Sequence, residues 1–164
     1  MKTAVYAGSF DPPTLGHLWM IAEGGKLFDK LYISIGINPD KNYTFSVEER
    51  EEMLQESLKD IPGNFVISNF KNKFLVSYAQ EVGASYILRG VRNASDFEYE
   101  KNMKILNEDI APTVSTIFLT PPRHLAEISS SVVKGFCVSD GWEKYVSKYV
   151  NSYVLKKLQE WKSV

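Results

Sequence analysis

The chain has 164 residues, of which 44% are hydrophobic and 24% charged, with 7 prolines and 10 glycines. This composition is typical of one globular domain and excludes collagen, coiled coil and overall disorder. The 19 basic and 20 acidic residues give a net charge of −1. That balance argues against a nucleic-acid-binding protein, which usually carries a basic excess. We therefore expect a single domain over residues 1–164.

The cysteine content and the N-terminus indicate the compartment. The single cysteine, Cys137, excludes an intramolecular disulfide and a cysteine-rich zinc site. Without a partner, it is typical of a small buried residue in a reducing compartment. The residues after Met1 lack the apolar core of a signal peptide, and no run reaches the roughly 18 apolar residues of a membrane span. We expect a cytoplasmic protein that does not bind membranes.

Short apolar runs alternate with amphipathic stretches along the chain. Strands are predicted at residues 3–8, 31–37, 65–67, 86–88 and 114–119, and helices at about 15–28, 46–61, 73–82, 94–109, 129–136 and 143–162. Apolar strands separated by helices favour a parallel sheet that is covered on both faces. The last helix carries an apolar stripe, from Val150 to Trp161, that must pack on something. The pattern predicts an α/β fold with a doubly wound five-stranded parallel sheet and a helical C-terminal tail.

The residues after the first strand are the most informative, because ligands of open α/β sheets bind beyond the carboxyl ends of the strands. The segment Gly8–His17 reads GSFDPPTLGH. Gly8 lets the backbone approach a ligand closely, and Ser9 offers a hydroxyl. His17 falls on the first turn of a helix, where free N–H groups attract anions. Taken alone, the turn could serve packing only. It is neither a Walker A loop nor a G-x-G-x-x-G motif.

As a whole, this segment resembles the T/SFDPxTxGH motif of the nucleotidyltransferase superfamily, with Thr14–His17 at the T/HxGH signature. Within that superfamily, most of the chain is similar to the phosphopantetheine adenylyltransferase family. The similar segments are the first motif, Lys41, Thr44–Arg50, Leu88–Arg92, Asp96–Glu100 and Ile128–Ser131. The resemblance implies a Rossmann-like fold and the transfer of AMP from ATP to 4′-phosphopantetheine, which yields 3′-dephospho-coenzyme A and pyrophosphate.

Arg89 and Arg92 follow the fourth predicted strand. Two guanidinium groups there can clamp phosphates, because arginine binds such oxygens in a bidentate manner. Without context they could equally be two solvated arginines. The resemblance implies that Arg89 binds phosphopantetheine, that Arg92 binds the ATP phosphates, and that Glu100 lies beside the nucleotide.

The resemblance also implies a catalytic set and two binding sets. The catalytic residues are His17, Lys41 and Arg92, with Lys41 orienting the attacking phosphate. The phosphopantetheine-binding residues are Ser9, Lys41, Leu75 and Arg89. The ATP-binding residues are Ser9, Phe10, His17, Gly90, Val91, Arg92, Glu100, Leu125, Ala126, Glu127, Ile128, Ser129, Ser130 and Ser131.

Two positions depart from the family pattern, since Leu125 and Glu127 stand where aromatic residues are common. The resemblance therefore supports phosphate contact at Ser129–Ser131 more strongly than adenine contact at Leu125 and Glu127. His124 is expected at the surface.

No cluster of metal ligands is visible in the sequence, so Mg²⁺ is expected to arrive with ATP. The family implies a homo-oligomer, a hexamer by resemblance. Two alternatives remain open: a related nucleotidyltransferase that uses nicotinamide mononucleotide or glycerol phosphate, and a non-catalytic metabolite-binding relative.

Overall fold

A computed structural model describes residues 1–163. Its strands are β1 (Thr3–Gly8), β2 (Lys30–Ile37), β3 (Phe65–Lys71), β4 (Tyr86–Gly90) and β5 (Ser115–Leu119). Its helices are α1 (Leu15–Leu27), α2 (Val47–Leu58), α3 (Leu75–Glu81), α4 (Ala94–Ile110), α5 (Arg123–Ala126), α6 (Ser130–Phe136), α7 (Glu143–Val146) and α8 (Ser152–Lys162). The strands form one parallel sheet in the order β3-β2-β1-β4-β5, which confirms the predicted doubly wound Rossmann-like architecture.

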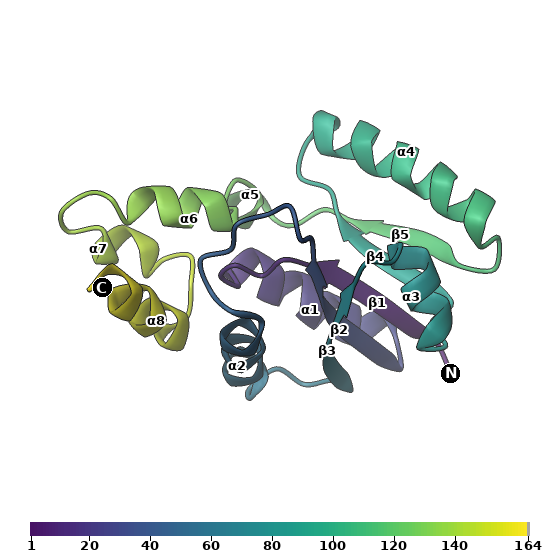
Figure 1. The fold of residues 1–164 in the computed structure, drawn as a ribbon, viewed down its shortest axis with the longest axis horizontal. Helices are drawn as coiled ribbons and strands as arrows, with labels where there is room; N and C mark the ends of the chain where they lie inside the picture. Colours follow the sequence, from purple (N-terminus) through teal and green to yellow (C-terminus); the bar gives the residue numbers. More distant parts are fainter. Residues whose placement is uncertain (164) are drawn as a thin grey trace.

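The sheet is covered on both faces (Figure 1). Strand residues alternate between the faces: Ala4 and Tyr6 pack with α1 and α2, whereas Val5 and Ala7 pack with α3. The order reverses at β1, because the chain first proceeds to β2 and β3 and then returns to β4 on the other side. The carboxyl end of β1 is thus a topological switch point, where such sheets bind ligands.

Local signals explain where the first two helices begin. The Thr14 side chain accepts a hydrogen bond from the His17 amide, and the Ser46 side chain accepts one from the Glu49 amide. In both helices the side chain at the third helical position bonds back to the backbone of the capping residue. These reciprocal bonds satisfy N–H groups that the first turn leaves without partners.

The C-terminal third differs from the expectation in two respects. The helix predicted over 143–162 is two helices, α7 and α8, because the Asn151 side chain caps a new helix start by accepting from the Val154 amide. The break also exposes the Tyr149 carbonyl, which accepts a hydrogen bond from the Leu15 amide at 2.7 Å, at the start of α1. A short helix that was not predicted, α5, precedes α6.

The C-terminal helices share an apolar core with Phe45 and with Met53 of α2. Val150, Val154 and Leu158 are buried there together with Cys137, and α8 lies against α2. The expected stripe therefore packs on the body of the protein, although Trp161 stays 37% exposed. None of the helices within residues 1–163 is both long and apolar enough to cross a membrane.

Candidate active site

A cavity of about 320 Å³ opens beyond the carboxyl ends of β1 and β4. Its walls come from the turn after β1, the start of α1, the end of β4 and the segment around α5 and α6. The lining residues are Tyr6, Ala7, Gly8, Ser9, Thr14, Gly16, His17, Met20, Arg89, Gly90, Arg92, Pro121, Leu125, Ile128, Ser129, Ser130 and Ser131. We call this the first cavity. Its volume lies in the range of small-molecule sites.

His17 is held in one orientation. Its Nδ1 accepts a hydrogen bond from the Thr14 amide at 3.0 Å, and an amide nitrogen can only donate. The proton of the neutral ring therefore sits on Nε2, which is free to donate to a ligand. Burial, together with the positive charge of Arg92, lowers the pKa of His17 to about 4. His17 is thus a neutral donor at physiological pH.

The two arginines after β4 have different surroundings. Arg89 Nε donates to one carboxylate oxygen of Glu100 at 2.8 Å, and Nη2 donates to the other. Arg89 Nη1 donates to the Ala7 carbonyl at 3.0 Å. Glu100 is only 8% exposed, so the pair is largely shielded from water. Arg92 is exposed and donates to Asp96 at 2.9 Å. Arg89 is therefore fixed in place, whereas Arg92 can exchange its surface partner for a ligand.

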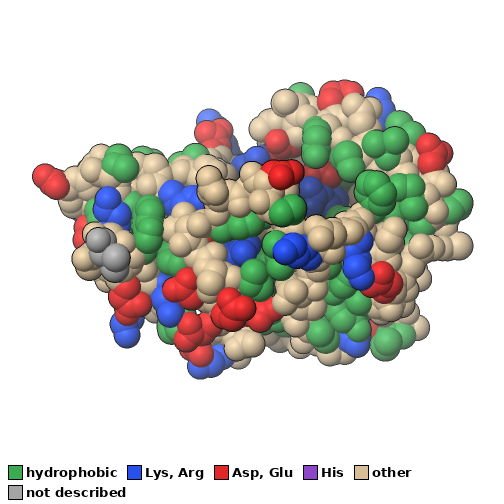
Figure 2. Space-filling view, viewed as in Figure 1, with side chains coloured by type: hydrophobic (Ala, Val, Ile, Leu, Met, Phe, Trp, Pro, Cys, Tyr) green, Lys and Arg blue, Asp and Glu red, His purple; other side chains and the backbone are tan. Residues whose placement is uncertain are grey.

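A second cavity, of about 370 Å³, adjoins the first. Its lining residues are Gly8, Ser9, Gly36, Ile37, Asn38, Lys41, Tyr43, Phe70, Asn72, Lys73 and Arg89. Gly8, Ser9 and Arg89 belong to both cavities, so the spaces meet at the turn after β1. Blue Lys and Arg side chains gather across the middle of the face in Figure 2, between the C-terminal helices and α3 with α4. Such a surface suits anionic ligands.

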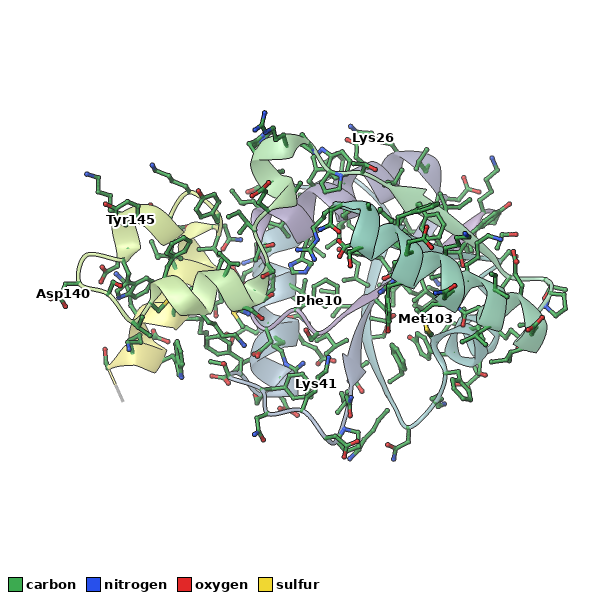
Figure 3. All side chains as sticks on the ribbon, turned by 90° about the horizontal axis from the view of Figure 1, so that it is seen from above. Phe10, Lys26, Lys41, Met103, Asp140 and Tyr145 are labelled. Atoms are coloured by element: carbon green, nitrogen blue, oxygen red, sulfur yellow. The ribbon has the colours of Figure 1, made fainter. Side chains whose placement is uncertain are left out.

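Lys41 lies on the loop after β2, as the view from above in Figure 3 shows. The Lys41 amide donates to the Asn38 carbonyl at 3.1 Å, which closes a turn. The side chain is exposed and pairs with no carboxylate within residues 1–163. Its ammonium group is therefore available to a ligand in the second cavity.

A buried ion pair connects three segments around the site. Asp11, which is 3% exposed, accepts hydrogen bonds from the amides of Thr44 and Phe45 and from Lys134 Nζ at 2.8 Å. Arg50, also buried, donates to the Ser9 carbonyl at 2.9 Å. These bonds hold the turn after β1 against the segment leading to α2 and against α6. Neither interaction was predicted from the sequence.

The structure gathers most of the expected site residues and leaves some apart. The first cavity takes Ser9, His17, Arg89, Gly90, Arg92, Leu125, Ile128 and Ser129–Ser131, and the second takes Ser9, Lys41 and Arg89. Phe10, Leu75, Val91, Glu100 and Ala126 line neither cavity, and Glu127 lies with Arg123 and the exposed His124 at a separate depression. Phe10, near the centre of Figure 3, is a fully buried core residue.

Several lining residues were not predicted from the sequence, among them Tyr6 and Met20 in the first cavity and Asn72 and Lys73 in the second. Tyr6 had a usable signal, because it lies two residues before Gly8 near the end of the first strand. Met20 lies one helical turn after His17 and so faces the same side of α1.

The site does not fit a resident metal ion. Within residues 1–163, no group of three or more His, Cys, Asp and Glu side chains is placed to hold one. The carboxylates of Glu100 and Asp96 are already paired with Arg89 and Arg92, and that of Asp11 with Lys134. The polar groups that remain around the first cavity are mainly cationic or hydroxyl donors.

Comparison with known proteins defines the class and then the family. The cytidylyltransferase-like family model matches residues 5–136. The solved structure of Plasmodium falciparum nicotinic acid mononucleotide adenylyltransferase complexed with NaAD aligns with a TM-score of 0.75 at 15% identity, covering 98% of this chain and 96% of that chain. At that identity the likeness shows the fold alone. Fold and family model together define a cytidylyltransferase-like nucleotidyltransferase.

Closer relatives identify the family within this class. A phosphopantetheine adenylyltransferase of Neisseria meningitidis serogroup C (strain 053442) is 52% identical over 157 residues, covering 96% of this chain and 92% of that protein. A second, from Chromobacterium violaceum, is 51% identical over 158 residues and covers 96% of both chains. The chain belongs to the phosphopantetheine adenylyltransferase family.

Proposed function

We propose that the protein transfers AMP from ATP to 4′-phosphopantetheine, which gives 3′-dephospho-coenzyme A and pyrophosphate. The observation that carries this proposal is the pair of cavities that meet at Gly8, Ser9 and Arg89. ATP occupies the first cavity and phosphopantetheine the second, so that the two phosphate groups meet at the shared residues. The relatives in the same family carry the name of this activity.

In this arrangement, an oxygen of the phosphopantetheine phosphate attacks the α-phosphorus of ATP. A new P–O bond forms, the bond to the bridging α–β oxygen breaks, and pyrophosphate leaves with that electron pair. The attacking group is already an anion, so no side chain has to remove a proton. Catalysis then depends on positioning and on stabilising the charge at the α-phosphate.

The side chains have separate roles in this proposal. His17 donates its Nε2 proton in a hydrogen bond to the α-phosphate, and Lys41 orients the attacking phosphate. Arg92 binds the β and γ phosphates, and the hydroxyl groups of Ser129 and Ser131 add donors on the same side, whereas the Ser130 hydroxyl donates to the Pro12 carbonyl at 2.8 Å and holds the segment in place. Arg89 contacts phosphopantetheine, which its place in the second cavity supports, because Arg92 does not line that cavity.

Two further residues of the expected sets, Leu75 and Glu100, line neither cavity, whereas Leu125 lines the first cavity. Leu75 lies half-buried at the start of α3 and would contact the pantetheine arm. Glu100 acts by holding Arg89. Leu125 would pack on adenine where other members of the family have an aromatic residue. Mg²⁺ would enter bound to the triphosphate and neutralise part of its charge.

The proposal includes assembly and location. We expect a homo-oligomer, as the family implies, in the cytoplasm. Exposed apolar side chains on α4, including Phe97, Leu106 and Ile110, are compatible with burial between subunits. Sedimentation velocity would measure the assembly, and a monomer at micromolar concentration would contradict this part.

A pyrophosphate-release assay tests the activity. The protein is incubated with ATP and Mg²⁺ and with phosphopantetheine, nicotinamide mononucleotide or glycerol phosphate as acceptor. We expect release with phosphopantetheine and little with the other two. A preference for nicotinamide mononucleotide or glycerol phosphate would indicate a related nucleotidyltransferase that uses another phosphate acceptor, and no release with any acceptor would indicate a non-catalytic binding protein.

A further inference from the structure

Tyr6 lies in β1 with its ring on the α1 side of the sheet. The residue is 7% exposed, and it also lines the first cavity. Within residues 1–163, the only fully buried side-chain polar atom without a hydrogen-bond partner is the Thr116 hydroxyl. The Tyr6 hydroxyl has no protein partner either, so it must keep some contact with the cavity. A buried tyrosine usually satisfies its hydroxyl group, and here only the cavity can supply the partner.

The ring of Tyr6 is held in place by its neighbours. It packs edge-to-face on Phe10, with ring centroids 5.6 Å apart, and Phe10 packs in the same manner on His17 at 5.1 Å. Phe10 is fully buried, so Tyr6 and His17 both pack on one rigid side chain. The hydroxyl group is therefore preorganised toward the cavity that His17 also lines.

The charges around Tyr6 indicate which ligand group it meets. Arg89 and Arg92 line the same cavity as Tyr6 and place positive charge there, and His17 offers a neutral N–H beside them. Burial raises the pKa of Tyr6 well above its ordinary value, so the phenol remains protonated and can donate. A ligand group that binds among these donors must carry hydrogen-bond acceptors. A phosphate fits, because it has several oxygens that accept hydrogen bonds.

We propose that Tyr6 is a nucleotide-binding residue whose hydroxyl donates a hydrogen bond to a phosphate oxygen of ATP in the first cavity. This inference rests on the proposed function for the choice of ATP. It adds a contact that lies outside the sequence motif, on the strand itself.

Tyr6→Phe tests the proposal, because it removes the hydroxyl and retains the ring that packs on Phe10. We expect the affinity for ATP, measured by calorimetry with Mg²⁺, to fall about 10-fold, as for the loss of a hydrogen bond to a charged group. The affinity for adenosine should change less than 2-fold, since it carries no phosphate. Tyr86→Phe is the matched control. It alters a half-buried tyrosine of β4 that does not line the first cavity, and its ATP affinity should match the wild type.

Each outcome decides the proposal. Equal ATP affinity in wild type and Tyr6→Phe would overturn it, as would an equal loss for adenosine, which would mean that the hydroxyl binds the nucleoside. A wild-type protein that neither binds ATP nor releases pyrophosphate would instead overturn the proposed function. If Tyr6→Phe melts well below the wild type, a crystal structure of the wild type with a non-hydrolysable ATP analogue decides. A distance from Tyr6 Oη to a phosphate oxygen of about 3 Å supports the contact, and one above roughly 4 Å refutes it.

Discussion

His17 owes its protonation state to its place at the start of α1. The Thr14 amide requires an acceptor at Nδ1, and burial beside Arg92 keeps the ring neutral. A neutral donor placed by the backbone needs no rearrangement when charge develops on the ligand. Oriented donors of this kind contribute more to the transition state than to ground-state binding.

His17→Ala should therefore lower kcat by about 10²-fold or more while the affinity for ATP changes less, because the lost bond is strongest in the transition state. Steady-state kinetics and ATP titration measure the two effects. His124→Ala is the control, since His124 is exposed and lies outside both cavities. A rise in KM alone would show that His17 only binds the ground state.

Arg89 and Arg92 should act on different substrates. Arg92→Ala should weaken ATP binding roughly 10- to 150-fold, as expected for a lost charge-assisted bond, and should leave phosphopantetheine binding nearly unchanged. Arg89→Ala should act mainly on phosphopantetheine. It should also lower stability, because Glu100 would stay buried without its partner. Calorimetry with each substrate separately measures the split, and equal losses for both ligands in both variants would indicate one shared anion site.

At the scale of elements, Gly24 near the end of α1 shows how packing overrides helix propensity. A Cβ atom at Gly24 would lie 2.8 Å from Leu31 and 2.9 Å from Leu88, both fully buried leucines of the sheet. At Gly24, α1 therefore lies closer to the sheet than a residue with a Cβ atom would allow. Glycine weakens the helix by about 1 kcal/mol, but the close approach requires it.

Gly24→Ala and Gly135→Ala should have opposite effects on stability. The first should lower the free energy of unfolding by about 1–2 kcal/mol, because overpacking outweighs the gain in helix propensity. The second should raise it by roughly 0.5–1 kcal/mol, since a Cβ atom on this residue of α6 meets nothing within 4 Å. Urea denaturation measures both changes. Stabilisation by Gly24→Ala would show that the leucines can move aside.

At the scale of the whole molecule, polar contacts attach the C-terminal helices to the sheet-based part, in addition to the apolar packing of α8 on α2. They include the bond from the Leu15 amide to the Tyr149 carbonyl and the ion pair between Asp11 and Lys134. Because α6 begins at the first cavity, these contacts also set the position of Ser129–Ser131 relative to His17. Figure 1 shows these helices at the left, joined to the rest beside α1 and α2.

Lys134→Met should lower the free energy of unfolding by about 2 kcal/mol, because Asp11 is 4% exposed at its side chain and keeps only its two amide donors. Lys134→Arg should restore part of the loss. Lys26→Met is the matched control, since Lys26 is 69% exposed in its pair with Glu23, and such pairs contribute less than about 1 kcal/mol. Equal stability of Lys134→Met and wild type, by chemical denaturation, would show that the ion pair contributes nothing net.

The order of the strands, the helices α1 to α4 and α6, the capped starts of α1 and α2 and the placement of His17 could be predicted from the sequence. These features depend on residues within a few positions of one another, where periodicity and capping act. The family resemblance supplied most of the site residues in the same way, through contiguous motifs.

The pairing of Arg89 with Glu100, the Asp11–Lys134 ion pair, the break before α8 and the partnerless Tyr6 hydroxyl needed the tertiary structure. Each depends on groups from different elements, such as the 123 positions that separate Asp11 from Lys134. Burial and hydrogen bonding decide these contacts only after the chain has folded. The local sequence therefore determined which groups are present at the site, and packing decided which of them are left free to bind a ligand.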